Sequence, residues 1–390
     1  MMITICHGNL LTAEAQALVN TVNTVGVMGK GIALQFKRAY PANYAAYRAA
    51  CAASEVKLGK MFVFDSARLG PRRYVINFPT KGHWRADSKL SDIQAGLADL
   101  VRVVRERQIT SIAVPALGCG NGGLNWDEVR QAIEHAFAAL PDVQVLLFPP
   151  EGAPRPADMP VATEMPRLTE GRATLLRAIE RYLQRAQTLE PRDGVTVLEI
   201  QKIAYFLQAL GQPLRLQFVR GRYGPYAENL NHVLDRLEGH YLTGFGDRSA
   251  RVEELQPIRL TDGTSDAIAT WFEAHGSPSP DTLDQLARLV NGFEAPYSLE
   301  LLATVHYAAA LHPPTNDLAE LIERVRSWSG RKARLFTRPH IKLAYDRLQS
   351  AGLLPCTGSG VIAGGAEQSP QNREDQQNDE KLVGFPSDES

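Results

Sequence analysis

The stretch Ala17-Leu-Val-Asn-Thr-Val-Asn-Thr-Val-Gly-Val-Met-Gly-Lys-Gly31 runs from a short apolar segment into a glycine-rich loop, and a helical pattern begins at Ile32. A second stretch repeats this organisation, because Ile112-Ala-Val-Pro-Ala-Leu-Gly-Cys-Gly-Asn-Gly-Gly-Leu124 precedes a helical pattern from about Trp126. Glycine lets the backbone approach a ligand without an intervening Cβ. A turn that leads into a helix N-terminus points N–H groups at a site that favours negative charge. Two such loops favour a nucleotide-like ligand whose diphosphate is held from both sides.

Around these loops the first 150 residues alternate between strand and helix patterns. Such alternation predicts an α/β fold with a mixed, mostly parallel sheet between helices. Ligands of such folds bind at the carboxyl ends of the strands, where both glycine loops fall. We expect strands over residues 3–6, 17–19, 61–64, 74–78, 111–115 and 143–148, and helices over 32–39, 91–107 and 126–139.

The segment between the two loops reads Tyr74-Val-Ile-Asn-Phe-Pro-Thr-Lys-Gly-His-Trp-Arg85. Its apolar strand is expected to end at Pro79, because proline lacks the N–H that a ladder needs. Lys81 follows at once. A lysine after a strand is most often only solvated, so the residues alone leave its role open.

Three motifs carry a resemblance to a known family: GNLLTAEAQALVNTVNTVGVMGKGIALQFK over residues 8–37, NFPTKGHW over 77–84 and PALGCGNGGLNW over 115–126. They resemble macrodomains, and within them the DarG antitoxins, over about residues 2–150. The resemblance implies a macrodomain fold and a hydrolase that removes ADP-ribose from DNA, with thymidine as the modified base. It also implies a DarT-like toxin as the opposing partner, single-stranded ADP-ribosylated DNA as the substrate and ADP-ribose as the product.

The resemblance also implies which residues form the site. Lys81 is the expected catalytic lysine, and Asn23 is expected to face the distal ribose as its catalytic partner. The neutral Lys81 amine could attack C1″, or the ammonium could orient the substrate or protonate the leaving group. Contacts to ADP-ribose are expected from Asn9, Leu10, Asn20, Asn23, Gly29, Lys30, Gly31, Thr80, Gly118, Cys119, Gly120, Asn121, Gly122, Gly123 and Leu124.

Some of these residues have simpler interpretations, and two depart from the family pattern. Asn20 could equally be a turn-stabilising asparagine, and Cys119 is better explained as a small turn residue than as a nucleophile. Most relatives have an aspartate where this chain has Asn9, whose amide oxygen can still accept a hydrogen bond from adenine. A lysine-dependent relative has a catalytic aspartate where this chain has Gly122.

Charge and cysteine usage give further expectations. Residues 1–150 carry 16 Lys or Arg and 11 Asp or Glu, a balance that suits a polyanionic substrate. Around the predicted catalytic turn, the basic residues are Arg68, Arg72, Arg73, Lys81, Arg85 and Lys89, and a merely solvated face is an equal alternative. The four scattered cysteines indicate free thiols in the cytoplasm, without a metal site. We expect no signal peptide, no membrane segment and no cofactor.

Three further regions follow the predicted macrodomain of residues 1–150. Residues 151–167 form a proline-rich linker, 168–355 a mainly helical toxin-binding domain, and 356–390 a disordered acidic tail. LEIQKIAYFLQ and RYGPYAENL resemble a small helical domain of several antitoxins, and residues 340–354 resemble a helix from a winged-helix module. We expect a strand over 216–219 and helices over 198–210, from Pro225, and over 286–290, 298–310 and 341–353. The aromatic residues of the 168–355 domain are expected in its core more than in an interface.

Three functional hypotheses remain at this point. The first is a DNA ADP-ribosyl glycohydrolase whose C-terminal domain also restrains the toxin. The second is a module that binds ADP-ribose without turnover, and the third is an antitoxin that acts mainly by sequestration. The Lys81 turn favours the first hypothesis over the second, and the long second domain supports the third.

Overall fold

The computed structural model describes residues 2–67, 69–249, 256–276 and 280–355. It divides into two compact units. The first unit comprises Met1–Met165 and Thr243–Gln256, and the second comprises Pro166–Leu242 and Pro257–Ser390. The tail predicted for residues 356–390 lies outside the described residues.

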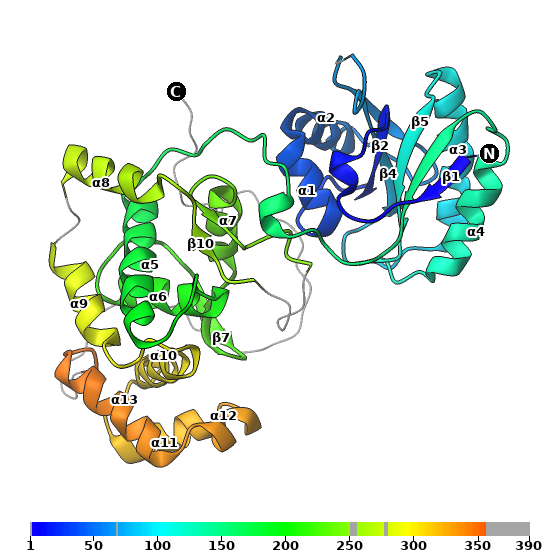
Figure 1. Ribbon diagram of the computed structural model, residues 1–390. Coiled ribbons are helices and arrows are strands. Elements are labelled where there is room, and N and C mark those ends of the chain that lie inside the picture. The colour runs from blue at the N-terminus through cyan, green and yellow to red at the C-terminus, as the bar shows by residue number, and fades with distance from the viewer. Residues whose placement is uncertain (1, 68, 250–255, 277–279, 356–390) are drawn as a thin grey trace. The chain divides into compact units, whose positions relative to one another are not determined.

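A six-stranded sheet forms the centre of the first unit (Figure 1), with strand order β1-β6-β5-β2-β4-β3. Only the β3–β4 pair is antiparallel, so the predicted mixed, mostly parallel sheet is confirmed. The strands are β1 Met2–Ile5, β2 Ala17–Asn23, β3 Phe62–Asp65, β4 Tyr74–Lys81, β5 Ser111–Pro115 and β6 Gln144–Phe148. The helices are η1 Leu10–Thr12, α1 Gly31–Ala39, α2 Pro41–Ala52, α3 Leu90–Glu106, α4 Trp126–Phe137 and η2 Pro156–Asp158.

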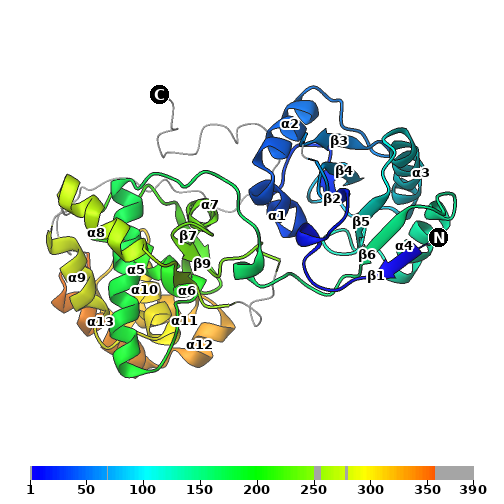
Figure 2. The ribbon, with the colours of Figure 1, turned by 45° about the horizontal axis from the view of Figure 1, so that its top comes forward.

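Helices cover both faces of this sheet (Figure 2). Side chains alternate along a strand, so Ile76 and Phe78 of β4 pack with α3 and α4, whereas Val75 packs on the other face with Phe36 of α1. Gly96 permits the close approach of α3, because a Cβ there would lie 2.3 Å from the Phe78 ring. Buried on both faces, β2 and β4 are held firmly enough to position the loops that follow them.

Strand β4 differs from its prediction, because it continues through Pro79 to Lys81. Its register against β2 shifts at this point, since Val22 pairs with Pro79 and Asn23 pairs with Lys81. Thr80 is therefore an extra residue in β4. Proline is tolerated in a strand beside such an irregularity, and the extra residue sets Lys81 directly opposite Asn23.

A segment distant in sequence also belongs to the first unit. The Gly31 N–H donates to the Asp247 carbonyl at 2.9 Å, and the Gln35 side-chain amide donates to the Asp247 carboxylate at 2.6 Å. The Arg38 guanidinium donates to the Gly246 carbonyl at 2.8 Å. The predicted 168–355 domain includes these residues, whereas their contacts group them with the first unit. The N-cap residue of α1 makes no side-chain capping bond, so Asp247 supplies an acceptor to the first turn.

We expect Asp247→Ala to lower the free energy of unfolding of the first unit by about 1–3 kcal/mol, because the buried Gln35 amide loses its acceptor. Hydrogen exchange of the α1 amides in the full chain measures this locally and should become faster. Asp142→Ala, at an exposed position of the same unit, is the matched control and should leave exchange unchanged. Equal exchange in the Asp247 variant and the native chain would contradict the capping role.

The second unit is mainly helical, as predicted. Strands β7 and β8 form an antiparallel hairpin, and β9 and β10 form another two-stranded sheet. The helix expected from Pro225 begins instead at Glu228, because residues 224–227 pair with β7. The elements are α5 Glu170–Leu189, α6 Val197–Ala209, β7 Phe218–Gly221, β8 Gly224–Ala227, α7 Glu228–Leu237, β9 Leu242–Thr243, β10 Arg259–Leu260, α8 Thr264–His275, α9 Pro280–Val290, α10 Pro296–Ala310, α11 Leu318–Arg326, α12 Gly330–Leu335 and α13 Arg338–Ser350.

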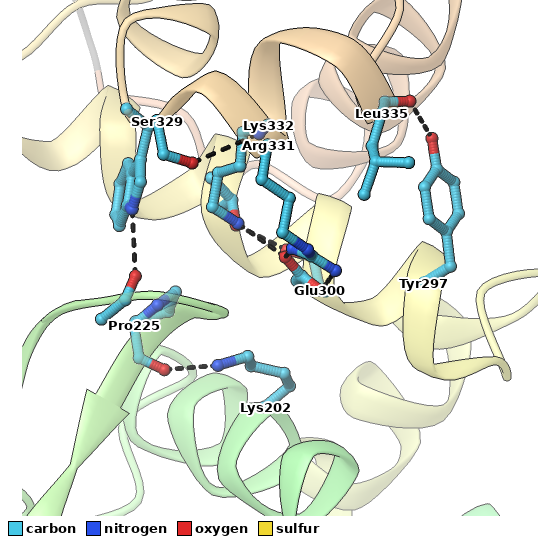
Figure 3. A network of polar contacts seen from close by, with 11 residues as sticks. Lys202, Pro225, Tyr297, Glu300, Ser329, Arg331, Lys332 and Leu335 are labelled. Carbon is cyan, nitrogen blue, oxygen red and sulfur yellow. Dashed lines mark hydrogen bonds and ion pairs between the residues drawn. The ribbon is translucent and has the colours of Figure 1, made fainter. Parts of the chain in front are cut away.

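A buried ionic cluster joins four elements of this unit (Figure 3). Glu300 of α10 accepts hydrogen bonds from Arg331 at 2.6 Å and from Lys332 at 2.8 Å, both on α12. Lys202 of α6 donates to the carbonyl of Pro225 in β8 at 2.5 Å, and burial lowers the pKa of Lys202 to about 7. Because Glu300 and Lys332 are both buried, loss of the Glu300 charge would leave the Lys332 ammonium without compensation inside the unit.

Candidate active site

Three loops follow the neighbouring parallel strands β2, β4 and β5, so they meet at one edge of the sheet. They cover residues 24–30, 82–89 and 116–125. The Thr24 hydroxyl donates to the Gly82 carbonyl at 2.7 Å and joins the first loop to the second. The Ser88 N–H donates to the Gly122 carbonyl at 3.0 Å and joins the second loop to the third.

Lys81 lies at the junction of these loops. Its Nζ donates to the Asn121 carbonyl at 2.8 Å, and its Cα is the β-sheet partner of Asn23. A Cβ on Gly31 would lie 3.4 Å from the Asn121 amide nitrogen, so the two glycine-rich loops also approach each other here. Partial burial lowers the pKa of Lys81, and the nearby Asp87 carboxylate opposes this shift. The structure therefore brings Lys81, Asn23 and both glycine loops together.

Asn23 shapes the first loop with its side chain. Its Oδ1 accepts hydrogen bonds from the N–H groups of Val25 at 3.0 Å and Val27 at 3.2 Å, and its Nδ2 donates to the Val27 carbonyl at 2.6 Å. The Tyr47 hydroxyl donates to the Asn23 carbonyl from α2. The side-chain amide is therefore used within the protein, and contact with a ribose stays a prediction.

The position of Asn20 corrects the interpretation as a turn-stabilising residue. It lies within β2, not in a turn, and it is fully buried. Its Nδ2 donates to Asn77 at 2.9 Å, and Asn77 in turn donates to Asn43 at 2.7 Å. This amide network ties β2 to β4 and α2, and contact of Asn20 with ADP-ribose stays a prediction.

The second glycine loop is tightly packed at some positions and open at others. A Cβ on Gly122 would lie 2.2 Å from the Ser88 hydroxyl and 2.5 Å from the Gly118 carbonyl, whereas a Cβ on Gly120 or Gly123 would meet nothing within 4 Å. The loop in this form has no room for an aspartate at position 122. Lys81 therefore has no carboxylate partner from that position.

Cys119 packs in the same loop against the core. Burial raises the pKa of its thiol to about 11, and its Sγ donates to the Leu117 carbonyl at 3.6 Å. At neutral pH the group is a thiol, and the thiolate is the nucleophilic form. These observations support the interpretation of Cys119 as a small turn residue.

Asn9 and Leu10 are held by local structure. The Asn9 Oδ1 caps η1 by accepting from the Leu11 N–H, and its Nδ2 donates to the Asp158 carbonyl at 2.9 Å. The amide oxygen expected to accept a hydrogen bond from adenine therefore already accepts one. Leu10 and Thr80 are buried, whereas Gly29 and Lys30 are exposed at the end of the first loop.

The predicted basic cluster divides between the two ends of β4. Arg73 pairs with Asp65 and Arg72 pairs with Glu14, beside the beginning of the strand. Eight residues of strand span about 26 Å, so these pairs lie at the edge opposite Lys81. Arg85 and Lys89 are exposed on the loop that follows Lys81, and Arg68 lies outside the described residues.

The described residues offer neither a cluster of metal ligands nor a helix that spans a membrane. Within those ranges, no group of three or more His, Cys, Asp or Glu side chains is placed to hold a metal ion. Among the described helices, none is both long enough and apolar enough to cross a bilayer.

Comparison with known proteins identifies the family. The Macro domain family model matches residues 19–133. A Mycobacterium tuberculosis protein named DNA ADP-ribosyl glycohydrolase is 47% identical over 352 residues, which cover 89% of this chain and 99% of that protein. This chain belongs to the DNA ADP-ribosyl glycohydrolase family. It is therefore an enzyme of that class and a homologue of the DarG antitoxins, and its sequence matches the family across both units.

Two further matches concern the first part of this DarG homologue. A Thermosipho africanus protein named DNA ADP-ribosyl transferase-DNA ADP-ribosyl glycohydrolase fusion protein is 35% identical over 142 residues, 33% of this chain and 37% of that protein. The solved macrodomain of Mycobacterium tuberculosis DarG is 59% identical to this chain, with a TM-score of 0.38. The match covers 38% of this chain and 99% of the solved macrodomain.

We expect Gly120→Val to weaken the binding of free ADP-ribose by about tenfold or more, since this open position is where a ligand would meet the new side chain. Calorimetry measures the affinity, and the thermal midpoint should stay unchanged. Gly122→Ala is the structural counterpart, because its Cβ would collide with Ser88 and should lower the thermal midpoint. Unchanged affinity in the Gly120 variant would exclude this loop from ligand binding.

Proposed function

We propose that this DarG homologue hydrolyses the N-glycosidic bond between ADP-ribose and thymidine in single-stranded DNA, with Lys81 acting at C1″ of the distal ribose. The observation that supports this proposal is the meeting of Lys81 with two glycine-rich loops at the carboxyl edge of the sheet. The open backbone of the second loop and the exposed Gly29–Lys30 end of the first would hold the diphosphate from its two sides.

Lys81 could act in two ways. As a nucleophile, its amine lone pair would form a bond to C1″ while the C1″–N bond breaks and its electrons pass to the base, which takes up a proton. Water would then release ADP-ribose and restore the amine. As an acid, the ammonium would instead protonate the departing base while water attacks C1″. The lowered pKa of Lys81 increases the fraction of neutral amine that the first route needs.

We expect Asp87→Asn to lower the pKa of Lys81 further, because the Asp87 charge raises it. If the neutral amine attacks C1″, the rising limb of the rate–pH profile should move to lower pH, so turnover near neutrality increases. If the ammonium is the acid, the falling limb should move to lower pH instead. Turnover of an ADP-ribosylated oligonucleotide over a pH series measures both limbs of the profile.

Two variants control this experiment. Lys81→Ala should lower kcat by about 10²-fold or more while free ADP-ribose still binds, and Asp142→Asn should leave the profile unchanged. Near-native turnover by Lys81→Ala would overturn the catalytic role. Borohydride reduction should trap a protein–sugar adduct only if Lys81 attacks C1″.

We further propose that the second unit binds a DarT-like toxin in the cytoplasm. The match to the Mycobacterium tuberculosis relative extends over 89% of this chain, well past the first unit, and the name of the Thermosipho africanus relative joins a transferase and a glycohydrolase in one protein. Among the exposed large apolar side chains of the second unit are Tyr297, Leu335 and Leu343. Such side chains suit an interface built on apolar and aromatic contacts.

We expect Glu300→Gln to abolish toxin binding and leave the release of ADP-ribose from DNA intact. Loss of the Glu300 charge leaves Arg331 and Lys332 without their carboxylate, which should destabilise the second unit by about 3–5 kcal/mol. Lys81→Ala should instead keep toxin binding and lose the release of ADP-ribose from DNA. Both activities are measured on the full chain, by calorimetry with the toxin and by turnover.

Asp284→Asn is the matched control for this pair. It removes an exposed ion pair with Arg181 in the same unit, which contributes only about 0–1 kcal/mol. It should therefore keep both activities. If Glu300→Gln unfolds the second unit and still binds toxin, the toxin-binding surface lies in the first unit.

A further inference from the structure

The turn that follows Lys81 presents an exposed aromatic surface. The Trp84 side chain is 45% exposed, and the Arg85 guanidinium lies 4.4 Å from the centre of its indole ring. The His83 ring lies 5.3 Å from the Trp84 ring at an interplanar angle of 30°. We call His83, Trp84 and Arg85 the aromatic turn.

Exposure distinguishes Trp84 from the other tryptophans of the chain. All four lie in described residues, and Trp84 is the most exposed of them. Trp126 packs against the core of the first unit, and Trp328 is 8% exposed. An indole left in water beside a catalytic group forgoes the stabilisation that burial gives the others, so its position is better explained by a ligand than by packing.

The aromatic turn is also fixed in place. The Arg85 N–H donates to the His83 ring at 3.2 Å, and the Ala86 N–H donates to the His83 carbonyl at 3.0 Å. The residues on either side are tied to the two glycine loops, Gly82 by Thr24 and Ser88 by Gly122. Such a surface loses little conformational freedom when a ligand binds.

We propose that Trp84 stacks on the base of a nucleotide adjacent to the ADP-ribosylated one. Trp84 lies three positions after Lys81, so their Cα atoms lie at most about 11 Å apart, a separation that a neighbouring nucleotide can span. Bases stack on aromatic side chains with little dependence on sequence. Arg85 supplies a positive charge beside the ring, where the DNA backbone passes.

This subsite rests on the single-stranded DNA substrate proposed above. It adds a residue that contacts the DNA strand rather than the ADP-ribose. It predicts that Trp84 matters only when the substrate has a neighbouring nucleotide. Stacking on a neighbour strengthens the binding of the strand, so its loss should appear in KM and leave kcat nearly unchanged.

The test compares two substrates of the full chain: an ADP-ribosylated oligonucleotide and the same base carrying ADP-ribose as a mononucleoside. Trp84→Ala should raise KM for the oligonucleotide by about tenfold and leave KM for the mononucleoside unchanged. Trp84→Phe should restore most of the affinity, because a phenyl ring also stacks. Arg85→Gln should reduce the salt dependence of oligonucleotide binding.

Trp271→Ala is the matched control, because Trp271 also stacks on a histidine, His275, but lies in the second unit. It should change neither KM. Binding of free ADP-ribose reports on the folding of the Trp84 and Arg85 variants, and the thermal midpoint reports on that of the Trp271 variant. An equal rise of KM for both substrates, or an unchanged KM for the oligonucleotide, would overturn the proposed subsite. If the native chain releases ADP-ribose from the mononucleoside but not from the oligonucleotide, the proposed DNA substrate fails instead.

Discussion

Strand β2 is paired in parallel with a neighbour on each side, and this constraint determines where the chemistry can take place. β4 lies along one edge of it and β5 along the other, so the loops that follow all three strands leave the sheet at the same edge. Amide side chains inside the sheet reinforce this pairing, because Asn20 of β2 bonds to Asn77 of β4. The extra residue Thr80 then sets Lys81 across from Asn23. A slip of one residue would turn the lysine to the other face.

The size of single residues limits the chemistry that this edge can perform. Gly122 packs so closely on Ser88 and Gly118 that a longer side chain has no place there. Cys119 is a neutral thiol at physiological pH. Lys81 therefore lies beside backbone groups and amides, and its Nζ donates to the Asn121 carbonyl. An amine that hydrogen-bonds to a carbonyl keeps its lone pair available after losing a proton, so this arrangement is compatible with either role of Lys81.

Much of the first unit was predictable because its signals are local. Apolar runs bounded by glycine predicted β5 over the residues that form it, and helical periodicity placed α1, α3 and α4 within two residues of their observed bounds. Pro79 was misleading, because a proline interrupts an ordinary ladder but is accommodated where the register shifts. Helix α2 was missed. Its composition is rich in alanine and tyrosine, and the structure shows that its Tyr47 and Ala50 pack with Val22 and Met28 in a buried cluster.

The errors at the site have a different cause, since they concern partners that are distant in sequence. Nothing near Asp247 in the sequence indicates that it contacts α1, because the contact depends on a chain that returns to the first unit from the second. The arginines that precede β4 form a cluster in sequence, but an eight-residue strand carries them to the far edge. The carboxylates Asp65 and Glu14 that neutralise them come from other segments. Counting charges along the sequence reveals neither where the arginines lie nor which carboxylates pair with them.

In the proposed mechanism, substrate binding would change the electrostatics of Lys81, and the change separates the two catalytic routes. A bound diphosphate adds negative charge near the amine and acts in the same direction as Asp87, which raises the pKa of Lys81. Exclusion of water by the ligand acts in the opposite direction. Backbone N–H groups of the glycine loops would neutralise part of the phosphate charge and so reduce its effect on the lysine. The pH dependence of kcat/KM reports pKa values in the free enzyme, and the pH dependence of kcat reports those in the enzyme–substrate complex. A lower pKa in the complex would mean that desolvation dominates and the amine is prepared to attack, whereas a higher pKa would favour the ammonium as the acid.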